Sequence, residues 1–177
     1  KWRNLAKRTL YDFIQPEQIL DWLGARGREL SAVVHLGAIS TTTANDAEAI
    51  MRNNIRLSLD LWDWCSAAQV PLLYASSASV YGDGAAGFDD DATPATLSRL
   101  RPLNLYGWSK LFVDRRIAQA LASGERTPPH WAGLRFFNVY GPNEYHKTGQ
   151  LSIALAAYEQ LRASGRCRLF RSDRPDI

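Results

Sequence analysis

A tyrosine and a lysine four residues apart are the side chains in this sequence best suited to proton transfer. They lie in the run Tyr106-Gly107-Trp108-Ser109-Lys110, whose surroundings predict a helix over residues 106–121. Residues four apart share one face of a helix, so the phenol and the ammonium group would address the same substrate. A phenol normally titrates at about 10, and a nearby cation favours the phenolate, which is the useful base. We expect Lys110 to supply that cation to Tyr106.

A serine completes the candidate site. Ser77 follows an apolar run at residues 70–76 that predicts a buried strand. Ligands of open α/β sheets bind beyond the carboxyl ends of parallel strands, where a serine hydroxyl can donate to an alcohol or carbonyl oxygen. A tyrosine and a lysine at this spacing are common on helix surfaces. The serine at the strand end makes the catalytic interpretation the preferred one.

Alternating strands and helices must position these residues. Short continuous apolar runs are typical of strands buried on both faces, and they occur at residues 31–38, 70–76, 131–137 and, more briefly, 168–170. Apolar residues at helical spacing occur at residues 15–26, 46–68, 106–121 and 149–163. This alternation predicts the α/β class with a doubly wound parallel sheet. Residues 81–103, rich in Gly, Asp, Thr and Pro, predict a long loop that carries function.

Composition and charge exclude several classes of protein. The 177 residues are 46% hydrophobic, enough for a core, and the net charge is only +3. The densest basic cluster, at residues 1–8, has no nucleic-acid motif, so we expect no nucleic-acid partner. The two cysteines have no paired spacing, which predicts neither a metal site nor a disulfide. No signal peptide is visible, and the apolar runs are far shorter than the roughly 20 residues of a membrane span. We therefore expect a cytoplasmic protein without a membrane partner.

The set Ser77, Tyr106 and Lys110 resembles that of the extended short-chain dehydrogenases, whose members act on nucleotide-linked sugars with bound NAD(P). The resemblance spans nearly the whole chain and implies a Rossmann-like fold and a homo-oligomer. Besides Tyr106 and Lys110, it implies cofactor contacts by Leu36, Gly37, Ala38, Ile39, Ser40, Asn53, Val139 and, more weakly, Lys1. It implies substrate contacts by Ser77, Asn138, His146 and Phe170.

A second run narrows the resemblance within this family. Residues 138–147, Asn-Val-Tyr-Gly-Pro-Asn-Glu-Tyr-His-Lys, with Ser-Thr-Thr-Thr at 40–43 upstream, resemble the members that epimerise ADP-heptose. This implies transient oxidation of ADP-D-glycero-D-manno-heptose at C6 with bound NADP or NAD, for a precursor of the lipopolysaccharide core. It also implies that Lys147 is a second acid–base group. By its surroundings alone, Lys147 would be an ordinary surface lysine.

Three alternatives remain open. A UDP-sugar 4-epimerase shares the Ser, Tyr and Lys set but does not require the extension at residues 145–147. A nucleotide-sugar 4,6-dehydratase is disfavoured because Ala78 and Ser79 stand where it usually carries an acidic pair. A non-catalytic NAD(P)-binding scaffold is a different class of protein, and it has no need for a tuned phenol.

The family opens with a strand and a Gly-rich turn that seats the pyrophosphate on a helix N-terminus, and no such pattern precedes Lys1. We therefore expect an incomplete NAD(P)-binding domain over residues 1–147 and the start of the sugar-nucleotide-binding portion over residues 148–177. As an isolated piece, the chain would bind cofactor weakly and show no turnover.

Overall fold

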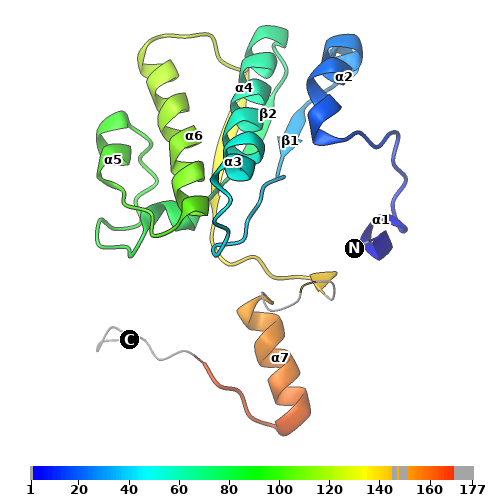
Figure 1. The fold of residues 1–177 in the computed structure, drawn as a ribbon, viewed down its shortest axis with the longest axis vertical. Helices are drawn as coiled ribbons and strands as arrows, with labels where there is room; N and C mark the ends of the chain where they lie inside the picture. The colour runs from blue at the N-terminus through cyan, green and yellow to red at the C-terminus, as the bar shows by residue number, and fades with distance from the viewer. Residues whose placement is uncertain (1, 145–146, 148–150, 170–177) are drawn as a thin grey trace. The chain divides into compact units, whose positions relative to one another are not determined.

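A computed structural model describes residues 2–144, 147 and 151–169 of the chain. It divides into two compact units (Figure 1), one formed by Asp12–Phe137 and the other by Lys1–Tyr11 together with Asn138–Ile177. The first unit contains the sheet and the candidate Ser, Tyr and Lys set. The predicted domain boundary after residue 147 stays a prediction.

A parallel sheet forms the centre of the larger unit. Its strands are β1 (Val33–His35), β2 (Leu72–Ser77) and β3 (Trp131–Phe136), in the order β1-β2-β3. Both pairings are parallel, with Val33 beside Leu72 and Ser77 beside Phe136. The strands therefore present their carboxyl ends at one edge of the sheet, where ligands of such sheets bind. The predicted α/β class and the parallel sheet are confirmed, and three strands are consistent with an incomplete sheet.

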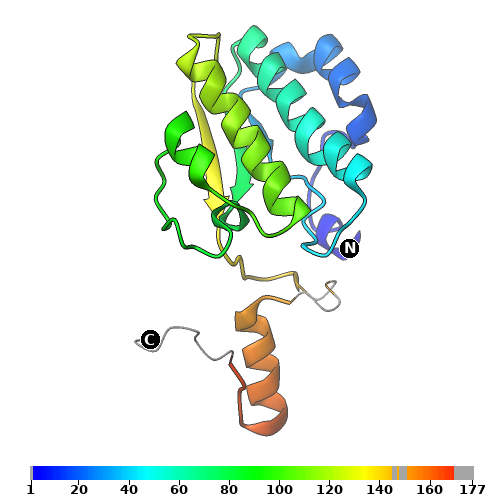
Figure 2. The same cartoon turned by 60° about the vertical axis from the view of Figure 1, so that its left-hand side comes forward.

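Two helices, α4 (Leu57–Ala68) and α6 (Leu105–Ala122), lie side by side on one face of the sheet (Figures 1 and 2). The core between these helices and the sheet is formed by Trp62, Cys65, Leu72, Tyr74, Val113 and Ile117. Trp62 also meets Trp131 edge to face, with ring centroids 5.1 Å apart. This packing places α6 directly over β2, so the residues on its inner face are set against the strand that ends at Ser77.

The helix predicted at residues 46–68 is confirmed, with one departure from regular geometry. It begins as α3 (Ala47–Ile50), capped by the Asp46 carboxylate, which accepts from the Ala49 N–H at 3.0 Å. It continues as the π-helical segment η3 (Met51–Arg56) before α4. π-Helical turns are rare and frequently mark functional sites. This one brings Asn54 and Ile55 into the interior.

The predicted helix at residues 15–26 begins as the short 3₁₀ helix η1 (Pro16–Gln18) and continues as α2 (Ile19–Arg26). Pro16 suits a first helical position because it has no N–H to leave unpaired. A short 3₁₀ turn η2 (Gly27–Glu29) follows α2, and α1 (Trp2–Leu5) lies in the other unit.

The stretch predicted as a loop contains two short helices. The 3₁₀ turn η4 (Ala78–Tyr81) follows Ser77 directly, and α5 (Pro94–Arg99) interrupts the rest. Thr93 caps α5, since its hydroxyl accepts from the Thr96 N–H, and Pro94 occupies the first turn. The Thr-Pro pair is a recognisable helix start. The prediction missed α5 because the helix is too short to show a period.

The smaller unit carries α7 (Ile153–Ser164), which confirms the helix predicted at 149–163 from residue 153 onward, while Leu151 and Ser152 precede it and residues 149 and 150 lie outside the described residues. The predicted strand at 168–170 is wrong for Arg168 and Leu169, which lie in no strand. The Arg168 N–H bonds the side-chain oxygen of Gln160 instead of a neighbouring strand. Phe170 lies outside the described residues. Within the described part of the chain, no helix is long and apolar enough to cross a membrane.

Candidate active site

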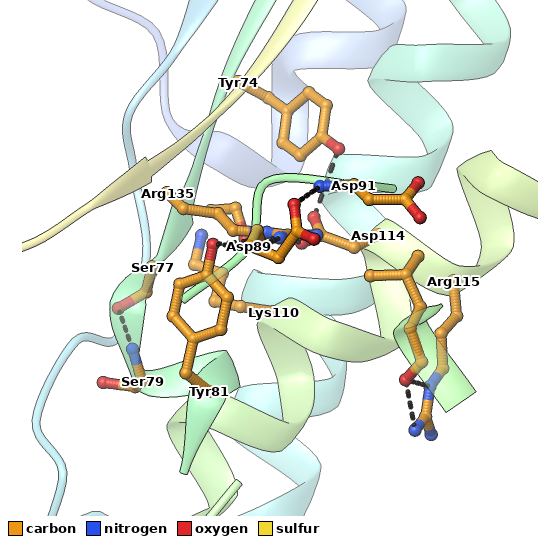
Figure 3. Close-up of polar contacts among 12 residues, drawn as sticks. Tyr74, Ser77, Ser79, Tyr81, Asp89, Asp91, Lys110, Asp114, Arg115 and Arg135 are labelled. Carbon is orange, nitrogen blue, oxygen red and sulfur yellow. Dashed lines mark hydrogen bonds and ion pairs between the residues drawn. The ribbon is translucent and has the colours of Figure 1, made fainter. Parts of the chain in front are cut away.

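Strand β2 and helix α6 together position the serine and the lysine of the predicted set. Ser77 ends β2, is 7% exposed, and its hydroxyl accepts from the Ser79 N–H at 3.2 Å (Figure 3). Lys110 is 3% exposed, and its Nζ donates to the carbonyl oxygen of Ala75 at 2.8 Å. The lysine therefore lies against β2 two residues before Ser77. The structure brings these two residues to the same end of the same strand.

Tyr106 lies in the first turn of α6, one turn before Lys110. Asn104 caps this helix, with its side-chain oxygen accepting from the Gly107 N–H at 2.8 Å. A Cβ on Gly107 would come within 2.6 Å of the Ser79 carbonyl oxygen. Only glycine therefore lets the start of α6 lie this close to η4. The close approach fixes the turn that carries Tyr106 beside the segment that follows Ser77.

Burial shifts the pKa values of Lys110 and of the neighbouring His35. It lowers the pKa of Lys110, and the nearby Asp114 carboxylate opposes that shift. Burial, and then the charge of Lys110, lowers the pKa of His35 to about 4. His35 is thus neutral at pH 7, and its Nε2 lies 2.9 Å from the Ser58 hydroxyl. The interpretation of His35 as a hydrogen-bonded structural histidine is confirmed.

The two neighbouring asparagines of η3 have different roles. Asn53, the predicted cofactor contact, donates to the Ala49 carbonyl of its own helix at 2.8 Å. Asn54 is fully buried, accepts from the Ile39 N–H at 2.9 Å and donates to the Ile39 carbonyl at 3.0 Å. It also lies 3.1 Å from the Ser109 hydroxyl. Asn54 therefore ties the loop after β1 to α6, a role that its sequence position alone did not reveal.

The predicted cofactor segment, residues 36–40, follows the carboxyl end of β1. Leu36 is 58% exposed, and a Cβ on Gly37 would meet no atom within 4 Å. An exposed apolar side chain and an unobstructed backbone at this edge fit a dinucleotide, because its phosphates and rings need close approach to main chain. The predicted contact Lys1 lies outside the described residues.

A buried polar network that the sequence reasoning missed lies beside Lys110 (Figure 3). Asp114, one turn after Lys110, accepts from the Ser76 hydroxyl at 2.8 Å and from the Tyr74 hydroxyl at 3.2 Å. Arg135 of β3 pairs with the Asp114 carboxylate at 3.3 Å. The sequence could have indicated Asp114, because a residue four positions after Lys110 lies on the same face of the helix.

Lys147 and its surroundings belong to the smaller unit. Its Nζ lies 3.2 Å from the Glu144 carboxylate, which is 6% exposed and also accepts from the Gly141 N–H and from the N–H and hydroxyl of Ser152. The Ser152 N–H and hydroxyl lead the causes that lower the pKa of Glu144 to about 2. Glu144 thus holds Lys147 and the start of α7 together. That Lys147 reaches the substrate stays a prediction.

The remaining predicted substrate and cofactor residues are only partly described. Asn138 and Val139 begin the second segment of the smaller unit, and Val139 is 63% exposed. His146 and Phe170 lie outside the described residues. Among the described residues, no group of His, Cys, Asp and Glu could hold a metal ion.

A cavity of about 470 Å³ opens beside the Asp114–Arg135 pair, with Tyr74, Tyr81 and Phe137 also in its lining. Neither Ser77 nor Tyr106 nor Lys110 lines it. We therefore do not assign this cavity to the substrate of the predicted chemistry.

Comparison with known proteins identifies relatives over almost the whole chain. An ADP-L-glycero-D-manno-heptose-6-epimerase of Nitratidesulfovibrio vulgaris is 44% identical over 178 residues, covering 99% of this chain and 53% of the relative. A protein of the same name from Fusobacterium nucleatum is 41% identical over 174 residues, covering 97% and 51%. The crystal structure of the Helicobacter pylori ADP-L-glycero-D-manno-heptose-6-epimerase matches with a TM-score of 0.69 and 30% identity, covering 89% of this chain and 47% of that one.

These matches confirm the resemblance inferred from the two sequence runs. The chain spans about half the length of the relatives it matches. The model of the NAD dependent epimerase/dehydratase family matches residues 14–175, which include β1 to β3, Ser77, Tyr106 and Lys110. The chain therefore belongs to the NAD dependent epimerase/dehydratase family.

Proposed function

We propose that the full-length protein epimerises ADP-D-glycero-D-manno-heptose to ADP-L-glycero-D-manno-heptose by transient oxidation at C6, with NADP as the bound cofactor. The observation that carries the proposal is the buried Lys110 on α6, with Tyr106 one turn before it and Ser77 at the end of the strand that Lys110 contacts. The names of the relatives at 41% and 44% identity support the choice of substrate.

The proposed chemistry needs a base at the sugar hydroxyl while the carbon is oxidised. Tyr106 as the phenolate would take the proton from the C6 hydroxyl, and the Ser77 hydroxyl would donate to the same oxygen. Lys110, one turn further along α6, would place its ammonium group on the same side of the helix as the Tyr106 hydroxyl. A dinucleotide bound at the end of the sheet would supply the hydride acceptor and donor for C6, and inversion requires that the hydride return to the opposite face of the carbonyl. The proton then returns to oxygen, so no net oxidation results.

Inversion of the centre places the substrate oxygen differently in its two configurations. A second ionisable group would serve the second configuration better than one base moving around the substrate. Lys147 is our candidate, and its ion pair with Glu144 supports a defined position for the ammonium group. This role requires Lys147 to approach the same carbon as Tyr106.

We extend the proposal to the partners and the setting. An ADP-linked heptose is the small-molecule partner, the assembly is a homo-oligomer, and the reaction takes place in the cytoplasm. The unpaired cysteines, one of them buried, support a reducing compartment. The exposed aromatic pair Trp108 and Phe112, with ring centroids 5.6 Å apart on α6, supports a subunit contact on that helix.

The test is an NMR assay of the full-length protein with ADP-D-glycero-D-manno-heptose and no added cofactor. We expect the signals of the C6 epimer to grow, which requires both the reaction and a retained dinucleotide. The matched control is Tyr106→Phe, which removes only the proton-transferring oxygen and should retain the bound dinucleotide, measured by its absorbance after denaturation.

Two other results would replace the proposal. Turnover of a UDP-hexose, with none of the heptose substrate, would identify a UDP-sugar 4-epimerase. A bound dinucleotide without turnover of any nucleotide sugar in a broad panel would identify a non-catalytic binding protein.

A further inference from the structure

Asp114 and Arg135 form a buried ion pair that the proposed chemistry does not use. The Arg135 Nε lies 3.3 Å from the Asp114 Oδ2, and the two side chains are only 10% and 5% exposed. Removing two charges from water costs several kcal/mol per ion, so such a pair is maintained only with good geometry and further hydrogen bonds. The partners of each member therefore indicate what the pair does.

Asp114 connects helix α6 to the strand that ends at the candidate serine. Its carboxylate accepts from the hydroxyls of Tyr74 and Ser76, while Lys110 donates to the carbonyl of Ala75. Three consecutive residues of β2, just before Ser77, are thus bound by two side chains one turn apart on α6. These contacts determine how α6 lies along the strand, and with it where Tyr106 lies.

Arg135 connects the same carboxylate to the segment that follows Ser77. Its Nη1 donates to the Tyr81 hydroxyl and to the Asp89 carbonyl, both at 3.1 Å, and its guanidinium lies 5.2 Å from the Tyr81 ring centroid. Tyr81 itself donates to the Asp89 carbonyl at 2.9 Å. Figure 3 shows Tyr81, Asp89 and Arg135 meeting beside Lys110. The pair therefore joins β2, β3, α6 and the loop after η4.

The charges of the pair act on Lys110 as well. Burial raises the pKa of Asp114, and the hydrogen bond from Ser76 and the charge of Arg135 oppose this shift. The Asp114 carboxylate in turn raises the pKa of Lys110 against the effect of burial. Arg135 balances the carboxylate, so the interior carries no uncompensated negative charge.

The other titratable groups around Lys110 come from several neighbouring elements. The groups on the elements around it are His35 on β1, Tyr74 on β2, Tyr81 on η4, Tyr106 and Asp114 on α6, and Arg135 on β3. Burial, followed by the charge of Asp114, raises the pKa of Tyr74, which stays a neutral donor. Charged residues on α3, η3 and α5 are exposed to solvent, namely Glu48, Arg52, Arg56 and Arg99.

We propose that Asp114 and Arg135 are a charge-balanced positioning pair that holds α6 on the end of β2, with Asp114 offsetting the positive charge that Arg135 would otherwise place beside Lys110. The pair acts through Lys110 and the loop, and has no direct part in the reaction. The inference rests on the proposed function only in that Lys110 is taken to serve the chemistry.

The main test is Asp114→Asn in the full-length protein, which preserves shape and removes one negative charge. The pKa of Lys110 is measured by NMR on ¹³Cε-labelled lysine, with the signal assigned by its loss in Lys110→Met. Because the ammonium loses the favourable charge of the Asp114 carboxylate while the charge of Arg135 remains, we expect the pKa of Lys110 to fall. The fall in turnover on the alkaline side of the pH profile should therefore begin at a lower pH than in the wild type. Asp60→Asn, the same charge change on α4, should leave the titration of Lys110 unchanged.

A double variant separates charge balance from shape. Asp114→Asn with Arg135→Gln has the same net charge as the natural pair but lacks its hydrogen bonds. We expect the titration of Lys110 to return toward that of the wild type. A pKa that stays at the value of the single variant, or falls further, would refute charge balance.

A third variant tests the positioning role alone. Arg135→Lys keeps the charge but loses the forked donors, so the titration of Lys110 should be unchanged while amide exchange of residues 82–93 accelerates. Unchanged exchange would show that the pair does not hold the loop.

The readouts also separate this inference from the proposed function. If the titrations shift as expected but the wild-type protein turns over no nucleotide sugar, the proposed function fails and the positioning pair stands. If turnover is normal and Asp114→Asn leaves both the titration and the alkaline limb unchanged, the positioning pair is wrong.

Discussion

Helices α6 and α7 are built from the same local signals but have different surroundings. Each begins after a polar cap, Asn104 for α6 and Ser152 for α7. Helix α6 buries a continuous face that includes Lys110, Leu111 and Asp114, whereas no residue of α7 is buried among the described part of the chain. Local sequence thus accounts for the formation of both helices, whereas only α6 is buried against the sheet. Burial alone turns side chains of α6 into groups with shifted pKa values.

The largest expected effect separates the two helices by their tyrosines. Tyr106→Phe on α6 should lower turnover of the full-length protein by about a hundred- to ten-thousand-fold, because the proton-transferring oxygen is lost. Tyr158→Phe removes the same atom from the exposed face of α7 and should change turnover little. The measurement is the initial rate of epimer formation by NMR. Equal losses of turnover in both variants would contradict a specific role of Tyr106 in proton transfer.

Buried and exposed leucines test the packing of α6 itself. Leu111 is 1% exposed and Leu121 is 40% exposed. Leu111→Ala should lower the free energy of unfolding by about 2–5 kcal/mol, because it leaves a cavity as well as losing apolar burial. Leu121→Ala should cost clearly less. Urea unfolding followed by fluorescence compares the two, and a larger cost for Leu121→Ala would contradict the packing described for α6.

The burial of His35 predicts how stability depends on pH. Its pKa in the fold is about 4, below the ordinary histidine value of 6.5. Between pH 6.5 and pH 4, His35 therefore binds a proton in the unfolded chain but stays neutral in the folded chain. The contribution of neutral His35 to the free energy of unfolding is complete above about pH 6.5 and is lost as the pH falls toward 4. The total loss is roughly 3 kcal/mol.

His35→Gln should remove this dependence, as measured by urea unfolding at several pH values between 4 and 7. The control is His130→Gln, which changes an exposed histidine and should leave the pH dependence in place. An unchanged slope in His35→Gln would show that another group is responsible.

The smallest expected effect concerns the caps that the two helices share. Ser152→Ala and Asn104→Ala should each cost about 0.5–2 kcal/mol of helix stability, because each leaves a first-turn N–H without its acceptor. For α7 the readout is amide exchange of Leu155, whose N–H the Ser152 hydroxyl accepts at 3.2 Å. For α6 it is exchange of Gly107, which bonds Asn104. Faster exchange confined to the mutated helix would support two independent local caps.

Motifs and periodicity in the sequence were enough to predict much of this protein. The apolar runs located three strands, the helical spacing located the main helices, and the strand-end serine with the Tyr106 and Lys110 spacing indicated the family. These features are local, since a period of 2 or 3.6 residues and a capping side chain act within a few residues of themselves. Short elements without a period, such as α5, escaped prediction, and the strand predicted at 168–170 was wrong for Arg168 and Leu169.

Only the tertiary structure decided which side chains meet. Asn54, rather than Asn53, reaches the Ile39 backbone, because Asn54 is the one of the two that the π-helical segment η3 buries in the interior. Asp114 finds its partner in Arg135 across 21 residues of sequence because β3 is paired beside β2. Such pairings depend on packing between distant segments, and so does the desolvation that lowers the pKa of Lys110 and of His35.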